Sequence, residues 1–80
     1  MLDKESLALL ARMGSHPRAF VYFDTLARVA GLTHEVAAAK LEALERRGLV
    51  ASEPEPAGQI YRLTETGVRA RQEARDATRS

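Results

Sequence analysis

The spacing of apolar residues over Leu26–Val50 predicts two short helices joined by a tight turn and followed by a strand. The apolar side of the first helix consists of Leu26, Ala27 and Ala30. Gly31 comes directly after them, and glycine is the residue most often found in the left-handed position just past a helix. The first helix is therefore predicted to end at about Ala30.

The second helix of the pair is predicted to begin after Thr33 and to end at Gly48. The Thr33 hydroxyl can accept hydrogen bonds from the unpaired N–H groups of the first turn, and the intervening residues are strong helix formers. At about 100° per residue, the inward side of this helix carries Ala37, Leu41 and Leu44. The opposite side carries Glu35, Ala39, Glu42 and Arg46. The helix can therefore pack against a core while displaying a surface.

An amphipathic pattern over Leu2–Met13 predicts a helix at the start of the chain. Asp3 is its expected N-cap, and Gly14 is its expected end. The pattern gives this helix one apolar side, so it is expected to pack on the helix pair.

The run Ala19–Phe23 is rich in aromatic and β-branched residues and predicts a short strand. Asp24 is then the expected N-cap of a helix over Thr25–Ala30. A competing interpretation begins a helix at Pro17, in the first-turn position that proline favours, and continues it to Ala30. We prefer the strand, because five residues of this type rarely begin a helix.

A hairpin and a last helix are predicted after Gly48. Strands at 49–52 and 59–63 enclose a tip over 53–58 that contains two prolines and a glycine. Thr64 is then expected to cap a helix over 65–78. The predicted order is α-β-α-α-β-β-α, a mainly α fold with a small β-hairpin.

Composition is that of one folded domain of 80 residues, with 45% hydrophobic and 29% charged residues. The chain has no cysteine, which excludes disulfides and thiolate chemistry. No apolar run is long enough to cross a membrane and no signal-peptide pattern opens the chain, so we expect a cytoplasmic protein without a membrane partner. The net charge of +1 divides into +1 over residues 1–32, −2 over 33–60 and +2 over 61–80.

The motif residues resemble the winged helix-turn-helix domain of MarR-like and PadR-like bacterial transcriptional regulators. The resemblance covers roughly residues 20–72 and rests on Leu26, Ala27, Gly31, Leu32, Thr33, Leu44, Gly48, Leu49, Val50, Tyr61, Leu63, Thr64 and Gly67. It implies a single domain over 1–80, with the helix-turn-helix at 24–47, the wing at 49–63 and the C-terminal helix at 65–78.

The resemblance also implies a sequence-specific regulator that binds double-stranded DNA through the 33–47 helix in the major groove. By position, the base-facing candidates are His34, Glu35, Ala38, Ala39 and Glu42. Candidates for phosphate contacts are Thr33, Lys40, Arg46, Arg47, Arg18, Arg28 and Arg62. Many relatives act as dimers, for which the 2–13 and 65–78 helices would be available as a homodimer interface.

The charge pattern keeps a second function open. The presented helix face carries two glutamates and two alanines, and the hairpin tip carries Glu53 and Glu55 without a basic residue. Such a tip would repel phosphates. The alternative is a winged-helix adaptor that binds another protein without direct DNA contact.

Catalytic and metal-binding functions find no support in the sequence. There is no Gly-x-Ser-x-Gly motif or phosphate-binding glycine loop, so we expect no enzyme activity. Two histidines and scattered carboxylates predict neither a metal site nor a cofactor, and His34 is more simply a surface residue. At least two of the aromatics Phe20, Tyr22, Phe23 and Tyr61 are expected in the core, which argues against stacking of single-stranded bases.

Overall fold

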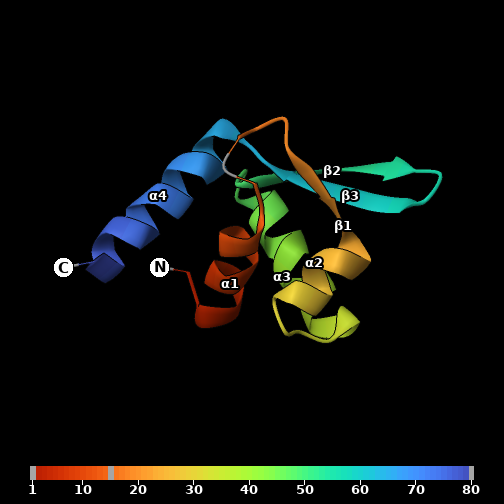
Figure 1. The fold of residues 1–80 in the computed structure, drawn as a ribbon, viewed down its shortest axis with the longest axis horizontal. Coiled ribbons are helices and arrows are strands. Elements are labelled where there is room, and N and C mark those ends of the chain that lie inside the picture. Colours follow the sequence, from red (N-terminus) through yellow and green to blue (C-terminus); the bar gives the residue numbers. More distant parts are fainter. Residues whose placement is uncertain (1, 15, 80) are drawn as a thin grey trace.

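The helices and strands follow one another in the predicted order, α-β-α-α-β-β-α. The structure is a computed structural model that describes residues 2–14 and 16–79. The elements are α1 (Lys4–Arg12), β1 (Phe20–Tyr22), α2 (Phe23–Val29), α3 (His34–Arg46), β2 (Val50–Glu55), β3 (Gly58–Leu63) and α4 (Glu65–Arg79). Figure 1 shows α1, α2 and α3 gathered on one side of the sheet, with the β2–β3 hairpin projecting beyond them.

The three strands form one antiparallel sheet in the order β1-β3-β2. Pairing of Val21 with Tyr61 confirms the strand before α2, so the competing helix that begins at Pro17 is wrong. The hairpin is tighter than expected, because β2 continues through Pro54 to Glu55 and only Pro56 and Ala57 form the turn. β2 lies at the edge of the sheet, where a proline without an N–H is tolerated.

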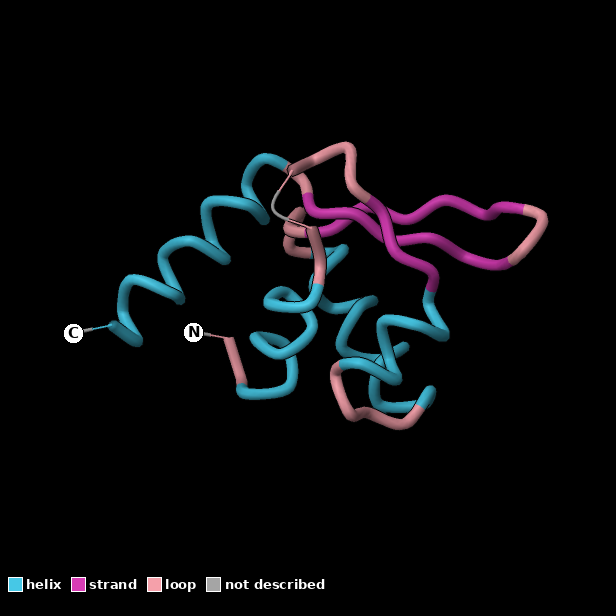
Figure 2. Tube along the Cα trace, viewed as in Figure 1, coloured by secondary structure: helices cyan, strands magenta, loops and turns pink. Residues whose placement is uncertain are grey.

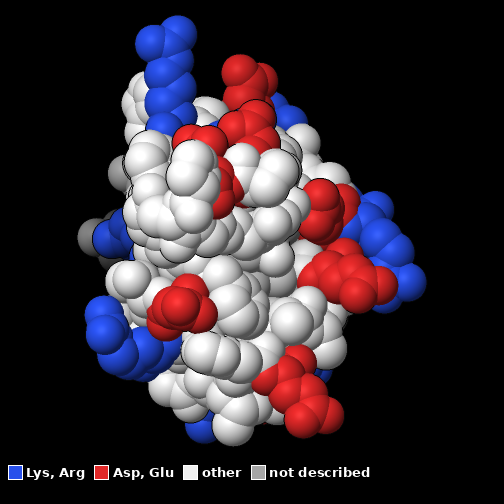
Figure 3. Space-filling model, turned by 90° about the vertical axis from the view of Figure 1, so that its right-hand side faces the viewer, with Lys and Arg blue, Asp and Glu red and all other residues white. Residues whose placement is uncertain are grey.

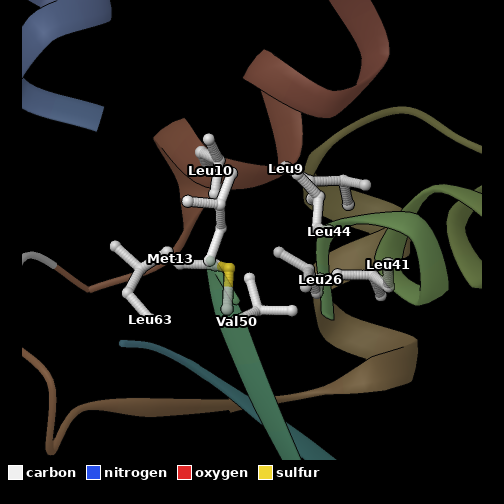
Figure 4. Packing of buried hydrophobic residues seen from close by; sticks show 9 residues of the cluster. Leu9, Leu10, Met13, Leu26, Leu41, Leu44, Val50 and Leu63 are labelled. Carbon is white, nitrogen blue, oxygen red and sulfur yellow. The ribbon is translucent and has the colours of Figure 1, made fainter. Parts of the chain in front are cut away.

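The core consists of leucines and a few other apolar side chains that converge from three helices and two strands. Figure 4 shows these side chains directed toward one another between α1, α3 and the sheet. The largest fully buried side chains are Leu9, Leu10, Leu26, Leu41, Leu44 and Leu63. Burial of each leucine contributes roughly 1.5–3 kcal/mol of transfer free energy, so this cluster holds the three helices in fixed positions.

Most of the predicted helix ends are confirmed by hydrogen bonds or backbone angles. Asp3 Oδ1 accepts from the Ser6 N–H at 2.9 Å. Thr33 Oγ1 accepts from the Val36 N–H at 3.2 Å, and Thr64 Oγ1 accepts from the Gly67 N–H at 3.0 Å. Gly31, with φ of 72°, and Gly48, with φ of 76°, adopt the left-handed conformation after α2 and α3.

Two expected helix ends are wrong. Asp24 does not cap α2, which begins at Phe23 with Tyr22 in the N-cap position and no side-chain cap. Tyr22 still pairs with Ile60, so β1 passes directly into α2 and leaves no room for a separate cap. Gly14 is not left-handed, and α1 ends at Arg12. A Cβ on Gly14 would lie 2.5 Å from the Ala19 Cβ, so this glycine permits close approach of two chain segments.

Candidate nucleic-acid interface

α3 presents a continuous outward face, and its inward residues hold it in place. Ala37, Leu41 and Leu44 are buried, as the helical spacing predicts. We define the outward face of α3 by its exposed residues Glu35, Ala38, Ala39, Glu42 and Arg46. The chain trace in Figure 2 places α3 with its N-terminal end toward the same side of the molecule as the hairpin. The fold therefore displays this face and the hairpin together.

The start of α3 is braced against α2 through His34. His34 Nε2 lies 3.5 Å from Asp24 Oδ1, and its ring centroid lies 5.3 Å from that of Phe23. Both side chains are largely exposed, so this contact orients His34 more than it stabilises the fold. His34 is therefore available at the surface, at the end of α3 that carries the positive end of the helix dipole.

Lys40 lies apart from the outward face. Its ammonium group is ion-paired with Asp3 Oδ2 and lies 3.5 Å from Glu5 Oε1, so it faces the start of α1. The hydrogen bond from Lys40 holds the Asp3 pKa well below its usual range, and the same contact raises the Lys40 pKa. The charge of Lys40 is thus compensated within the fold.

The other basic candidates are dispersed over several elements. Arg46 lies 3.9 Å from Glu42, and Arg62 lies 3.4 Å from Glu53 across the hairpin. Arg47 lines a groove between α1 and α4. Arg18 and Arg28 are exposed, and within the described residues neither forms an ion pair. The structure therefore does not gather these cations into one band.

Acidic side chains dominate the end of the molecule that bears the hairpin tip. Figure 3 faces this end and shows Asp and Glu spread across it, with Lys and Arg mainly at its margins. The exposed carboxylates on α3 and the hairpin are those of Glu35, Glu42, Glu45, Glu53 and Glu55. Such a surface weakens attraction to a phosphate backbone, since affinity for duplex DNA comes largely from neutralised phosphates.

The aromatic residues divide between the two faces of the sheet. Phe23 and Tyr61 pack against the core, with ring centroids 6.1 Å apart, as expected for at least two of the four aromatics. Burial raises the pKa of the Tyr61 phenol, with a further contribution from the nearby Glu45 carboxylate. Phe20 and Tyr22 are exposed, and their exposure was not predicted from the sequence. Their alternation with Val21 along one strand is the signal that could have revealed it.

The described residues offer neither a cluster of metal ligands nor a membrane-spanning helix. Among residues 2–14 and 16–79, no group of three or more histidine, aspartate or glutamate side chains could hold a metal ion. None of the helices described has the length and apolar character needed to cross a membrane.

No protein-family model matches the chain, and no curated protein matches it. Solved structures do match. AF1382 from Archaeoglobus fulgidus has a TM-score of 0.85 at 21% identity, over 98% of this chain and 88% of that one. A MarR-family transcriptional regulator from Silicibacter pomeroyi has a TM-score of 0.81 at 20% identity, over 90% of this chain. This chain spans about half the length of that regulator, 49%.

A third match is the homodimeric winged helix-turn-helix DNA-binding domain Mb0332 from Mycobacterium bovis, a possible ArsR-family regulator. Its TM-score is 0.78 at 23% identity, over 95% of this chain and 68% of that one. The MarR-like part of the resemblance is thus supported by structure, and the PadR-like part stays a prediction. The chain has the winged helix-turn-helix fold found in MarR-family and ArsR-like transcriptional regulators.

Proposed function

We propose that this domain belongs to a transcription regulator and binds double-stranded DNA with α3 in the major groove. The observation that carries the proposal is the exposed outward face of α3, fixed from behind by the buried Ala37, Leu41 and Leu44. The major groove is about 12 Å wide and admits a helix of this kind. In the proposed complex, the hairpin lies over the neighbouring backbone.

The proposed roles follow from position. Thr33 and the free N–H groups at the start of α3 suit a phosphate, because the N-terminus of a helix attracts anions. His34 and the outward face of α3 would meet base edges, where a glutamate can accept a hydrogen bond from a cytosine amino group. Among the candidates for phosphate contacts, Arg18 and Arg28 are exposed and form no ion pair with the described residues, so they would meet phosphates.

Binding to random-sequence duplex DNA should be measurable at low salt and should weaken as salt is added. With about three phosphates neutralised, a plot of log K against log salt is expected to have a slope of about −3. Fluorescence anisotropy of a labelled duplex measures this slope. The small slope follows from the cations that are already paired within the fold, such as Arg62 with Glu53.

The matched control for this titration is the variant Arg18→Gln/Arg28→Gln, which removes two exposed arginines proposed to meet phosphates. This variant is expected to bind random-sequence duplex DNA more weakly. The slope of its log K against log salt should change from about −3 to about −1. Absence of binding by the unmodified chain at about 50 mM salt would rule out DNA binding by the domain alone.

We also propose that the terminal helices provide a homodimer interface. A groove of about 690 Å³ between α1 and α4 is lined by Leu2, Leu7, Leu49 and Ala70 together with the charged residues Arg47, Arg69 and Glu73. Apolar surface of this kind marks contacts between proteins. The homodimeric state of the Mycobacterium bovis domain supports the proposal.

The variant Thr66→Arg is expected to weaken self-association. Thr66 is exposed and lines this groove, so an arginine there would obstruct a second copy without disturbing the core. Sedimentation equilibrium of the variant and the unmodified chain measures the change, with Val29→Thr on the exposed side of α2 as control. A chain that is monomeric at every concentration, or a dimer unaffected by Thr66→Arg, would contradict the proposed interface.

The acidic hairpin favours a second candidate function, binding of another protein. Glu53 already neutralises Arg62, and Glu55 is exposed. This arrangement suits a basic partner better than a phosphate backbone, and an adaptor of this kind would show no salt-dependent DNA binding.

A further inference from the structure

The face of the sheet that points away from the helices carries two exposed aromatic rings. Strand register places Val21, Tyr61 and Ser52 on one face, and the first two pack against the core. The neighbouring register positions therefore belong to the opposite face. We call this the outer sheet face, defined by Phe20, Tyr22, Ala51, Glu53, Glu55, Ile60 and Arg62.

The aromatic residues of the outer sheet face form a small apolar cluster separate from the core. Phe20 is 55% exposed and Tyr22 is 37% exposed, with their rings edge to face at 5.9 Å. Ile60 is buried yet does not belong to the core cluster, and its cross-strand partners are Tyr22 and Glu53. A Cβ on Gly58 would lie 3.9 Å from Tyr22 Cδ1, so this ring extends toward the end of the hairpin.

The charge beside this cluster is negative. Glu53 and Arg62 form an ion pair at 3.4 Å and neutralise each other. Glu55 follows on the same face, opposite Gly58, and within the described residues it forms no ion pair. The cluster therefore combines two aromatic rings with one uncompensated carboxylate at the edge nearest the hairpin turn.

We propose that the outer sheet face docks a segment of a partner protein that carries arginine or lysine beside apolar residues. A guanidinium or ammonium group is attracted to the face of an aromatic ring, and it forms a charge-assisted hydrogen bond with a carboxylate. Phe20 and Tyr22 supply the rings, and Glu55 supplies the carboxylate. Apolar side chains of the segment cover the rest of the rings.

The negative charge of the outer sheet face favours a basic protein segment over nucleic acid and over a second copy of the chain. Phosphates would be repelled by Glu55, and the same face of a second copy would bring together carboxylates of like sign. The outer sheet face also lies on the side of the sheet opposite the helices. A partner bound there leaves the outward face of α3 open but covers one face of the β2–β3 hairpin.

The test selects peptides from a displayed random library on the full chain and removes those that also bind the variant Phe20→Thr/Tyr22→Thr. Threonine keeps the strand propensity of β1 while removing the rings. The enriched peptides are expected to carry arginine or lysine beside apolar residues. A synthetic enriched peptide should bind the double variant at least about tenfold more weakly, as measured by fluorescence anisotropy.

Two further variants separate docking from a general loss of structure. Glu55→Lys reverses the charge of an exposed residue near the turn. It should lower the affinity for the peptide by a similar factor. Val29→Thr removes an exposed apolar side chain on α2 and should leave binding unchanged. The inference fails if no peptide depends on the two rings, if the enriched peptides lack basic residues, or if the double variant loses self-association or duplex DNA binding instead.

Discussion

The variant Gly67→Ala is expected to lose a large part of its folding stability. A Cβ at this position would overlap the carbonyl oxygen of Leu49 and lie 2.9 Å from its carbonyl carbon. That same oxygen accepts a hydrogen bond from the Thr64 N–H at 3.1 Å, so it is held in place. Overpacking typically costs 1–3 kcal/mol, and a clash with backbone should exceed about 3 kcal/mol. The total free energy of unfolding of a small domain is only about 5–15 kcal/mol.

Urea denaturation followed by circular dichroism measures this loss, with Gly31→Ala as the matched control. Gly31 has a φ of 72° and open space where a Cβ would lie, so alanine there meets only backbone strain. That strain should cost about 1–2 kcal/mol. An equal loss of unfolding free energy in both variants would contradict this explanation. Gly67 would then not be required by the close packing of α4 on the segment before β2.

The variant Glu35→Gln/Glu42→Gln is expected to bind random duplex DNA more tightly. The two carboxylates lie on the outward face of α3, about 10 Å apart along the helix axis at 1.5 Å per residue. Their removal eliminates repulsion of phosphates and frees Arg46 from its contact with Glu42. The gain should be about tenfold at low salt, equivalent to about 1.4 kcal/mol, and should shrink as salt is added.

The control for this gain is Asp76→Asn, which removes one exposed carboxylate from α4. Figure 1 shows that α4 extends toward the end of the molecule opposite the hairpin, so this change should leave DNA affinity nearly unchanged. Equal affinity of the double variant and the unmodified chain would mean that α3 does not face the DNA. The proposed interface would then be incorrect, whatever the total affinity.

The elements could be predicted from the sequence wherever a local pattern dictates them. α3 follows from the spacing of Ala37, Leu41 and Leu44, and its two ends follow from Thr33 and Gly48. These features depend on contacts within a few residues, which is why sequence alone is sufficient. The outward face of α3 was predictable for the same reason, because it is the side left over when the apolar stripe is buried.

The predictions from the sequence were wrong where a distant segment determines the local conformation. Asp24 is a good N-cap by type, but pairing of Tyr22 with β3 carries the chain into α2 one residue earlier. Gly14 is a good helix end by type, but contact with Ala19 explains its lack of a side chain. The length of β2 likewise depends on its pairing with β3 through Pro54. In each case a neighbour in space outweighs a local preference.

The sequence by itself determined the order of elements, the buried stripe of α3 and the acidic character of the hairpin, because periodicity and turn residues act locally. Only the tertiary structure decided which charges are free. It pairs Lys40 with Asp3, which lies 37 positions earlier in the chain, and Arg62 with Glu53 across two strands. It also leaves Phe20 and Tyr22 exposed on the outer sheet face. Charge compensation and exposure depend on contacts between distant segments, and these exist only after the chain has packed.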